Sequence, residues 1–312
     1  MTTPRTDDFS KKEAHDVTST DEITGEGSGS SAQTNETTHV SKKRPNAFTE
    51  LMSSRPRKYK SVTTPKAKST NTLGQAVEAF KSSDPRNGLG VYIERPETNP
   101  EGRIVEYDDE FVVIRDKFPK ASVHLLLLPR DPIYYVQHPL HLFSNSPSFL
   151  ASVLPRIANL KRLAAAELRR QYGQFSTTDR PYHTALEAVM DADQPPDTSE
   201  ALDALLPEGR DWLTDIVAGV HTHPSMNHLH IHVFSRDMHS PWLKHKKHYL
   251  SFKSSFLVQM DEFPLEQGSP RYHPGSWPSW DMKCWRCGRN FGNKFKALKE
   301  HLNEEFMEWK LE

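Results

Sequence analysis

Histidine and apolar residues alternate over residues 228–234, which read His-Leu-His-Ile-His-Val-Phe. Strict alternation predicts a β-strand, with His228, His230 and His232 on one face and the apolar side chains on the other. Because histidine is neither a favoured strand former nor a residue that is easily buried, three in a row indicate chemistry. The row suits either metal coordination or covalent catalysis, in which one imidazole attacks and its neighbours bind an anion. The spacing alone does not separate these two uses.

The two cysteines of the chain, Cys284 and Cys287, have the Cys-x-x-Cys spacing of a zinc knuckle. They rule out a disulfide framework and fit a reducing compartment. His301 follows after thirteen residues, and Glu305 lies one helical turn later on the same face. These four side chains could therefore converge as a tetrahedral zinc site. No histidine or cysteine follows His301, so the fourth ligand must be water or a carboxylate, from Glu304 or Glu305.

Other segments must position these residues. Short apolar runs predict strands at residues 91–93, 104–107, 111–116 and 123–130. The last run is too apolar to have a solvated face, so it should lie centrally in a sheet. Residues 146–173 have helical periodicity after a Ser-Pro start signal and should kink at Pro155. Residues 216–226 should form a strand and a turn at Pro224, which returns the chain into the histidine row as a hairpin. Residues 174–210 are expected to be a mobile, chemically silent loop insertion.

Composition bounds the class of protein. The 312 residues carry a net charge of −1, so global charge gives no reason to expect nucleic acid. No apolar run reaches membrane-spanning length, and we expect no membrane association. Residues 1–70 are polar and are expected to be a disordered tail, followed by an amphipathic helix at 72–80. The basic clusters at 42–45 and 55–60 fit nuclear-localisation signals, nucleic-acid contacts or a solvated linker.

Several segments together resemble the histidine-triad (HIT) family of nucleotide hydrolases and transferases, and more narrowly the aprataxin family. Residues 228–234 match the triad, and the strings at 112–121 and 124–130 match the N-terminal half of the domain. Residues 219–226 match the aprataxin lead-in Gly-φ-His-x-x-Pro-Ser-Met. The finger matches the Cys-Cys-His-Glu finger of fungal members, which favours Glu305 over Glu304 as the fourth ligand. The resemblance covers about residues 73–312, with a gap at 174–210.

The resemblance implies a role for each residue that matches the family pattern. His230 would attack the α-phosphate and form a nucleotidyl-histidine. His232 and Ser225 would stabilise the developing charge, and His228 would orient the attacking imidazole. His221, which the hairpin could bring over His230, would protonate the leaving group. No acidic residue is evident beside the triad, so we expect no catalytic metal.

Residues expected to contact the substrate lie outside the triad. By resemblance, Asp116 and Lys120 would contact the nucleotide, and Phe80 would stack on the adenine or wedge at the DNA end. Lys244 and Lys247 belong to a basic run with interleaved aromatics, which is expected to bind phosphates rather than to be only a solvated face. The finger carries four further cations that should grip DNA: Arg286, Arg289, Lys294 and Lys296.

We therefore predict an α+β fold with a HIT-type antiparallel sheet, flanking helices and a small C-terminal zinc finger. The catalytic domain should span residues 71–262 and the DNA-binding finger residues 263–312. The predicted activity is hydrolysis of AMP from 5′-adenylated DNA ends left by aborted ligation, with structural zinc. The alternatives are a general HIT phosphoramidase or dinucleoside-polyphosphate hydrolase, and a non-catalytic DNA-end-binding module. We expect a nuclear monomer that binds nicked DNA, releases AMP and meets repair proteins through residues 1–70.

Overall fold

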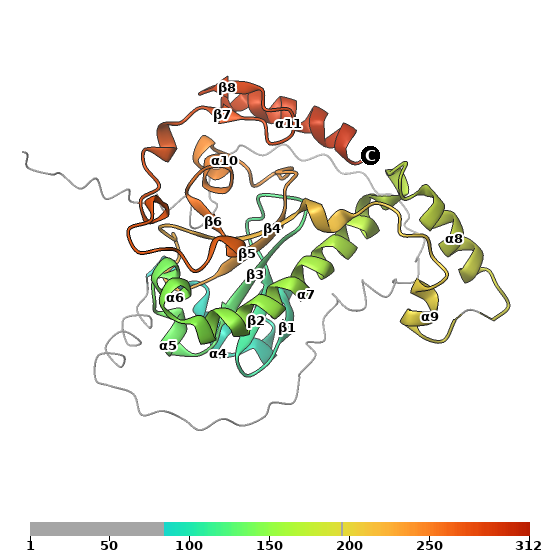
Figure 1. Ribbon diagram of the computed structural model, residues 1–312, viewed down its shortest axis with the longest axis horizontal. Coiled ribbons are helices and arrows are strands. Elements are labelled where there is room, and N and C mark those ends of the chain that lie inside the picture. The colour runs from blue at the N-terminus through green and yellow to red at the C-terminus, as the bar shows by residue number, and fades with distance from the viewer. Residues whose placement is uncertain (1–83, 195) are drawn as a thin grey trace, which may run out of the picture.

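A six-stranded antiparallel sheet carries the histidine row and organises the fold (Figure 1). The computed structural model describes residues 84–194 and 196–312. The strands lie in the spatial order β1-β2-β3-β5-β4-β6. Their bounds are β1 Ile104–Tyr107, β2 Phe111–Arg115, β3 His124–Pro129, β4 Ile216–His221, β5 Ile231–Ser235 and β6 Leu257–Gln259. The expected α+β fold is confirmed, whereas the tail, the helix at 72–80 and Phe80 lie outside the described residues.

Strand β3 lies in the interior of the sheet, as its apolar run predicts. It pairs with β2, where Leu126 lies opposite Ile114, and with β5, where Leu126 lies opposite His232. All residues of β3 are buried, which agrees with a strand that has no solvated face. The strands predicted at 104–107, 111–116 and 123–130 are thus confirmed with small differences at their ends.

Strands β4 and β5 form the predicted hairpin around the histidine row. They pair antiparallel, with Gly219 opposite His232. Strand β5 begins only at Ile231, so His228 and His230 lie in the connecting loop and not on the strand. The apolar residues at 229, 231 and 233 still pack into one core cluster. The alternation therefore sorts the side chains correctly even where the backbone is not a strand.

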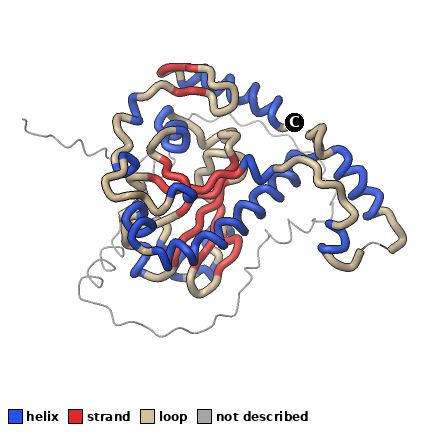
Figure 2. Tube along the Cα trace, viewed as in Figure 1, coloured by secondary structure: helices blue, strands red, loops and turns tan. Residues whose placement is uncertain are grey.

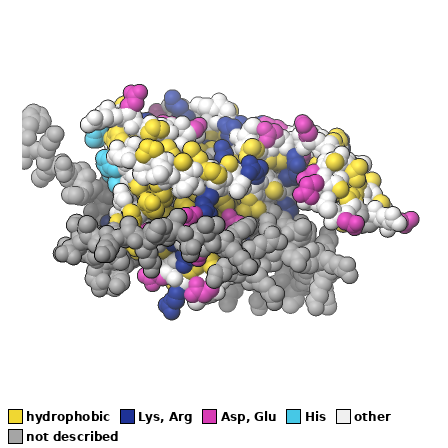
Figure 3. All heavy atoms as spheres, turned by 60° about the horizontal axis from the view of Figure 1, so that its bottom comes forward, with side chains coloured by type: hydrophobic (Ala, Val, Ile, Leu, Met, Phe, Trp, Pro, Cys, Tyr) yellow, Lys and Arg dark blue, Asp and Glu magenta, His cyan; other side chains and the backbone are white. Residues whose placement is uncertain are grey.

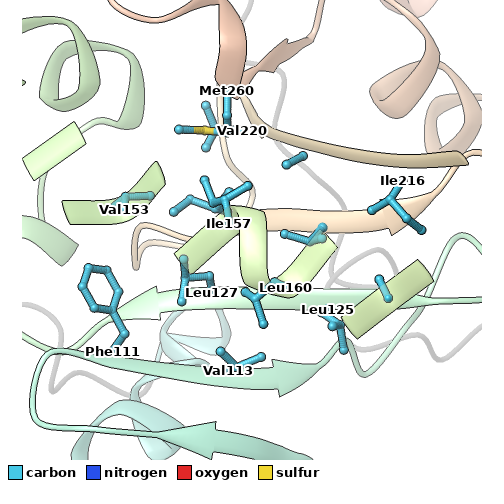
Figure 4. Packing of buried hydrophobic residues seen from close by; sticks show 14 of the residues in the cluster. Phe111, Val113, Leu125, Leu127, Val153, Ile157, Leu160, Ile216, Val220 and Met260 are labelled. Carbon is cyan, nitrogen blue, oxygen red and sulfur yellow. The ribbon is translucent and has the colours of Figure 1, made fainter. Parts of the chain in front are cut away.

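Helix α7, Pro147–Tyr172, covers one face of the sheet (Figure 1). Its buried residues Val153, Ile157 and Leu160 recur at helical spacing and face apolar residues of β2, β3 and β4 (Figure 4). The helix continues through Pro155 without ending there. Burial of this apolar stripe fixes the sheet from behind, so the opposite face remains available for the histidines.

Helix α4, Gly90–Glu94, packs on that opposite face at β2. The prediction of a strand at 91–93 is therefore wrong. Leu89, Tyr92 and Ile93 are buried while Val91 is 46% exposed, which is the i, i+3, i+4 spacing of a helix. A three-residue apolar run is too short to show its period, and the buried Leu89 that reveals the helix precedes it.

The stretch 174–210 is not a loop, contrary to prediction. It contains helices α8, Arg180–Met190, and α9, Ser199–Asp203, which project from the body (Figure 1). Acidic and hydrophobic side chains gather on this projecting part (Figure 3), with Met190 62% and Leu205 59% exposed. The base of this projecting part is fixed by the buried Asp179, which accepts hydrogen bonds from the Arg210 amide and the Trp212 indole.

The C-terminal finger is a two-stranded sheet followed by a helix (Figure 2). Its elements are β7 Met282–Lys283, β8 Asn290–Gly292 and α11 Phe295–Trp309, and the remaining α-helices are α5 Pro132–Tyr135, α6 Pro139–Asn145 and α10 Lys246–Lys253. Leu298 and Leu302 share a core with Leu243 and Tyr249, so the finger and the catalytic sheet are packed together. Within the part of the chain that the structure describes, no helix is both long and apolar enough to cross a membrane.

Candidate active site and metal centre

Three neighbouring strands place one histidine each on the face opposite α7. His124 comes from β3, His221 from β4 and His232 from β5. The ring of His232 lies between the others, with centroids 5.1 Å from His124 and 4.5 Å from His221. His230 joins the cluster from the loop, 4.9 Å from His232. The sequence signal therefore identifies a real cluster, and the sheet adds His124 to it.

The hydrogen bond of His230 defines its tautomer. Its Nδ1 lies 2.8 Å from the backbone oxygen of His228. A carbonyl oxygen can only accept, so Nδ1 carries the proton and Nε2 keeps a lone pair. Burial lowers the pKa of His230, although this hydrogen bond and the carboxylate of Asp116 oppose the change. The imidazole is therefore neutral near pH 7 and its Nε2 is unprotonated.

The contact of His228 with the His230 imidazole is made by its backbone carbonyl oxygen. The side chain of His228 instead packs 5.1 Å from the ring of Tyr135. A Cβ added to Gly90 would lie 3.2 Å from its Cε1 and Nε2, so the start of α4 closes over it. The His228 side chain is thus enclosed between Tyr135 and the first turn of α4.

A hydrogen-bond relay ends at His232. The amide of Lys120 donates to Nδ1 of His124 over 3.1 Å, so Nε2 of His124 carries the proton. That Nε2 lies 2.9 Å from Nδ1 of His232. His232 must then carry its own proton on Nε2, which among the described residues has no hydrogen-bond partner. The relay thus presents a buried donor to the site, a suitable partner for a phosphate oxygen.

Burial keeps this relay uncharged. It lowers the pKa of His124 to about 4, although the carboxylate of Asp116 opposes this change. The pKa of His232 is lowered well below its usual value by burial and by the neighbouring histidines. Each imidazole can therefore be assigned one neutral tautomer.

Asp116 lies at the edge of the same cluster. Its Oδ2 is 3.4 Å from Nε2 of His124, and its Oδ1 accepts from the Phe118 amide. Burial alone would raise the pKa of Asp116, but His124, Lys120 and the Phe118 amide together lower it. Asp116, His124 and His232 form a group that could hold a metal ion. The prediction that no carboxylate lies near the triad is therefore wrong, because β2 ends beside β3.

His221 contacts His232 rather than His230. Its ring lies 4.5 Å from that of His232 and 4.8 Å from that of Phe252. Burial and the neighbouring histidines lower its pKa well below the usual value, against a hydrogen bond to the Ser251 backbone. Among the described residues its Nε2 has no hydrogen-bond partner, so this atom is free to exchange a proton with a ligand.

The loop between β4 and β5 is held from outside the sheet. The Arg86 side chain donates to the Ser225 backbone oxygen over 3.0 Å, and the Asn227 amide donates to the Arg86 oxygen. Ser225 itself is half-buried, and the exposed His223 points to Thr222. The segment at 84–87 therefore braces the loop that carries Ser225 and His230.

Basic and aromatic side chains adjoin the Lys120 turn. Lys244 lies over the Trp242 ring, 4.6 Å from its centroid, and Trp242 meets Phe118 edge-on at 4.9 Å. Lys247 lies in α10 beside Lys246, whose ammonium donates a hydrogen bond to the Asn293 side chain of the finger. Within the basic run that was expected to bind phosphates, Lys246 thus links the finger to the catalytic domain, and Lys244 packs against Trp242.

The four predicted zinc ligands meet in the finger. The ligand atoms of Cys284, Cys287, His301 and Glu305 all lie within 4.8 Å of one another. His301 Nε2 is 3.1 Å from Cys287 Sγ and 3.0 Å from Glu305 Oε1. Bonds of 2.0–2.3 Å in a tetrahedron separate ligands by roughly 3.3–3.8 Å, so the set fits zinc after a small expansion. Glu304 faces the other ring nitrogen at 3.7 Å and is exposed.

Two residues differ from their sequence interpretation. The sequence analysis assigned no role to His124, because a single histidine in an apolar run is usually a buried packing residue. The information that the sequence did not provide is that its strand pairs with the strand that bears His232. Arg286 was expected to grip DNA, but its guanidinium bonds Glu305, Glu308 and Glu312 within the finger.

Comparisons with known families agree with this geometry. Residues 97–239 match the HIT domain, and residues 253–308 match the C2HE / C2H2 / C2HC zinc-binding finger. The protein is thus a HIT-domain protein with a C2HE-type finger.

The relatives narrow this class. The chain is 35% identical over 231 residues to an aprataxin-like protein of Schizosaccharomyces pombe, covering 74% of this chain and 85% of the relative. It is 32% identical over 228 residues to an aprataxin-like protein of Saccharomyces cerevisiae, covering 71% and 95%. A crystal structure of the aprataxin ortholog Hnt3 in complex with DNA is similar at 33% identity and a TM-score of 0.53, covering 72% and 96%. The chain belongs to the aprataxin family.

Proposed function

We propose that this protein hydrolyses AMP from 5′-adenylated DNA ends, the intermediates of aborted ligation. The observation that carries the proposal is His230, a buried neutral imidazole whose Nδ1 is bound to a carbonyl oxygen. Such an imidazole keeps its Nε2 lone pair for attack on phosphorus. Its neighbours supply a donor at His232 and a proton site at His221.

In the first step, His230 Nε2 forms a bond to the AMP phosphorus while the bond to the bridging oxygen breaks. The electron pair leaves with the DNA 5′-phosphate, and adenylyl-His230 remains. His232 Nε2–H donates to a non-bridging oxygen, and Ser225 is proposed to add to this stabilisation. Asp116, which lies beside His124, and Lys120 are proposed to contact the nucleotide.

His221 is proposed as the acid for the leaving phosphate. In the free protein it is neutral, because burial lowers its pKa. A pyrophosphate brings negative charge to this face, and an opposite charge favours the protonated imidazole. His221 would therefore take up its proton as the substrate binds and donate it from Nε2 to the departing oxygen. Water then attacks adenylyl-His230, which releases AMP and restores the imidazole. We propose these steps without a catalytic metal.

DNA as the substrate is supported by the relatives and by surface charge. Hnt3, to which the chain is similar, has been solved in complex with DNA. In this chain Lys244 lies beside the aromatic pair Phe118 and Trp242, next to the turn that bears Lys120. Cations with interleaved aromatics fit phosphates and exposed bases. A general phosphoramidase would not need this surface or the finger.

The test is release of AMP from a nicked duplex that bears a 5′-adenylate. We expect His230→Ala to abolish release and to prevent formation of a labelled adenylyl-protein. His273→Ala, which removes an exposed histidine, is the matched control and should match wild type. Faster cleavage of a small adenosine phosphoramidate than of the DNA would instead support a general HIT hydrolase. Tight DNA binding with no release from either substrate would support an end-binding module.

We further propose a nuclear monomer whose residues 1–70 recruit repair proteins. The basic clusters at 42–45 and 55–60 motivate this location. Replacing their lysines and arginines with glutamine in a fluorescent fusion should abolish nuclear accumulation. Unchanged accumulation would contradict this proposal.

A further inference from the structure

Arg286 occupies the knuckle between the two zinc-ligand cysteines, Cys284 and Cys287. Its guanidinium faces three glutamates of the C-terminal helix and tail. One terminal nitrogen donates to Glu305 Oε2 over 2.7 Å and to Glu308 Oε2 over 2.9 Å. The other terminal nitrogen and Nε donate to Glu312 Oε1 over 2.5 and 3.2 Å. The guanidinium is therefore held along two of its edges.

The two oxygens of Glu305 have different partners. Oε2 accepts from Arg286, whereas Oε1 lies 3.0 Å from His301 Nε2, toward the ligand set. The carboxylate is buried, with its side chain 8% exposed, while that of Arg286 is 27% exposed. A free carboxylate can bind a metal through one oxygen or both. Here the second oxygen is occupied by a charge-assisted hydrogen bond.

We propose that Arg286 is a positioning residue that makes Glu305 a one-oxygen zinc ligand. Outer hydrogen bonds commonly orient metal ligands in this way. Two thiolates and a carboxylate around a divalent cation leave one excess negative charge, which the guanidinium offsets. Glu308 and Glu312 anchor the guanidinium from behind, so that it is in place before the metal binds. The flat fork of arginine suits this bridging task, and the ammonium of lysine does not.

The inference does not depend on the proposed enzymatic activity, because its readout is metal binding by the full chain. Zinc affinity is measured by competition with a chromophoric chelator. We expect Arg286→Gln to weaken zinc binding by about 10- to 100-fold. Arg286→Lys should recover only part of this loss. Arg289→Gln removes the same charge from the same finger, where Arg289 lies over Phe291, and should change affinity less than about threefold.

A double-mutant cycle separates positioning from general stabilisation. Glu305→His supplies a ligand whose single lone pair needs no arginine to select it. In that background Arg286→Gln should change zinc affinity by less than about threefold. An equal loss in both backgrounds would overturn the proposal, because Arg286 would then act on the finger as a whole.

Cobalt substitution gives a second readout, which keeps the test valid if Glu305→His binds zinc poorly. Tetrahedral Co²⁺ has strong visible d–d bands, and these weaken when a fifth ligand atom binds. Arg286→Gln frees Oε2 of Glu305, so its cobalt bands should weaken and shift while those of Arg289→Gln stay as in wild type. Identical bands in wild type and Arg286→Gln would refute the proposal.

Discussion

His124 allows the relay to be tested by two substitutions of similar size. Asparagine places a side-chain oxygen near the position of Nδ1, so His124→Asn can still accept from the Lys120 amide. Glutamine places a side-chain nitrogen near the position of Nε2, so His124→Gln can still donate to His232. Each variant therefore removes one of the two hydrogen bonds, of 3.1 and 2.9 Å, that His124 makes.

The magnitudes follow from which buried atom loses its partner. A buried polar atom left unsatisfied costs about 1–3 kcal/mol, or roughly 5- to 150-fold. In His124→Asn the unsatisfied atom is Nδ1 of His232, so the tautomer that offers Nε2–H to phosphate is no longer fixed. We expect AMP release to fall by about tenfold to a hundredfold, together with a loss of about 1–3 kcal/mol in unfolding free energy. In His124→Gln the Lys120 amide loses its hydrogen-bond acceptor, so the free energy of unfolding should fall by about 1–3 kcal/mol.

The assay is single-turnover AMP release from the adenylated nick, with urea unfolding of the same samples. Both variants should lose stability, whereas at matched folded fraction only the asparagine variant should lose rate. If the two variants lose rate equally at matched folded fraction, His124 does not act through the tautomer of His232.

Three further outcomes follow from the structure. Burial lowers the pKa of His124 and His228 to about 4 from 6.5. Between these pH values the unfolded chain binds more protons than the folded one, so the stabilising effect is complete above about pH 6.5 and falls by about 3 kcal/mol per imidazole by about pH 4. Midpoints of urea unfolding at several pH values would measure this loss. A midpoint independent of pH would contradict this. Removal of zinc by a chelator should lower the melting temperature of the whole chain in one transition, because the finger and the catalytic domain share a core; two separated transitions would disprove that coupling. Gly219→Ala would place a Cβ 2.7 Å from the Val258 oxygen, so β6 must shift at a cost of about 1–3 kcal/mol in unfolding free energy; a variant as stable as wild type would show that this edge of the sheet yields freely.

The elements that sequence predicted best are those in which one periodicity runs long enough to be unambiguous. The 26 residues of α7 and the apolar run of β3 are of this kind. Short segments were ambiguous: residues 91–93 have strand-forming side chains but belong to the helix that begins at Gly90. Helix α8 within 174–210 was missed although Tyr182, Leu186 and Val189 recur at helical spacing. The polar residues and prolines at 191–197, which follow it, dominated the sequence interpretation.

The candidate site was predicted where one segment of sequence holds its residues together. The triad and the Cys-x-x-Cys knuckle are local patterns, and the structure brings their members together. His124 lies on a different strand from the triad, and the glutamates that bind Arg286 lie in and after α11, far along the chain from it. Neither role therefore follows from sequence spacing. Contacts between distant segments depend on register, which a one-residue shift would change completely.

The backbone decides which nitrogen of each imidazole in the histidine cluster carries its proton. A buried imidazole that stays neutral has two tautomers, and a partner that only donates or only accepts selects one. The Lys120 amide selects for His124 and, through it, for His232, while the carbonyls of His228 and Ser251 select for His230 and His221. Every residue has a backbone carbonyl and every residue except proline has an N–H, so no residue type in the sequence indicates this function. The side chains of Lys120, His228 and Ser251 can therefore change without loss of the selecting groups, provided that the backbone keeps its path.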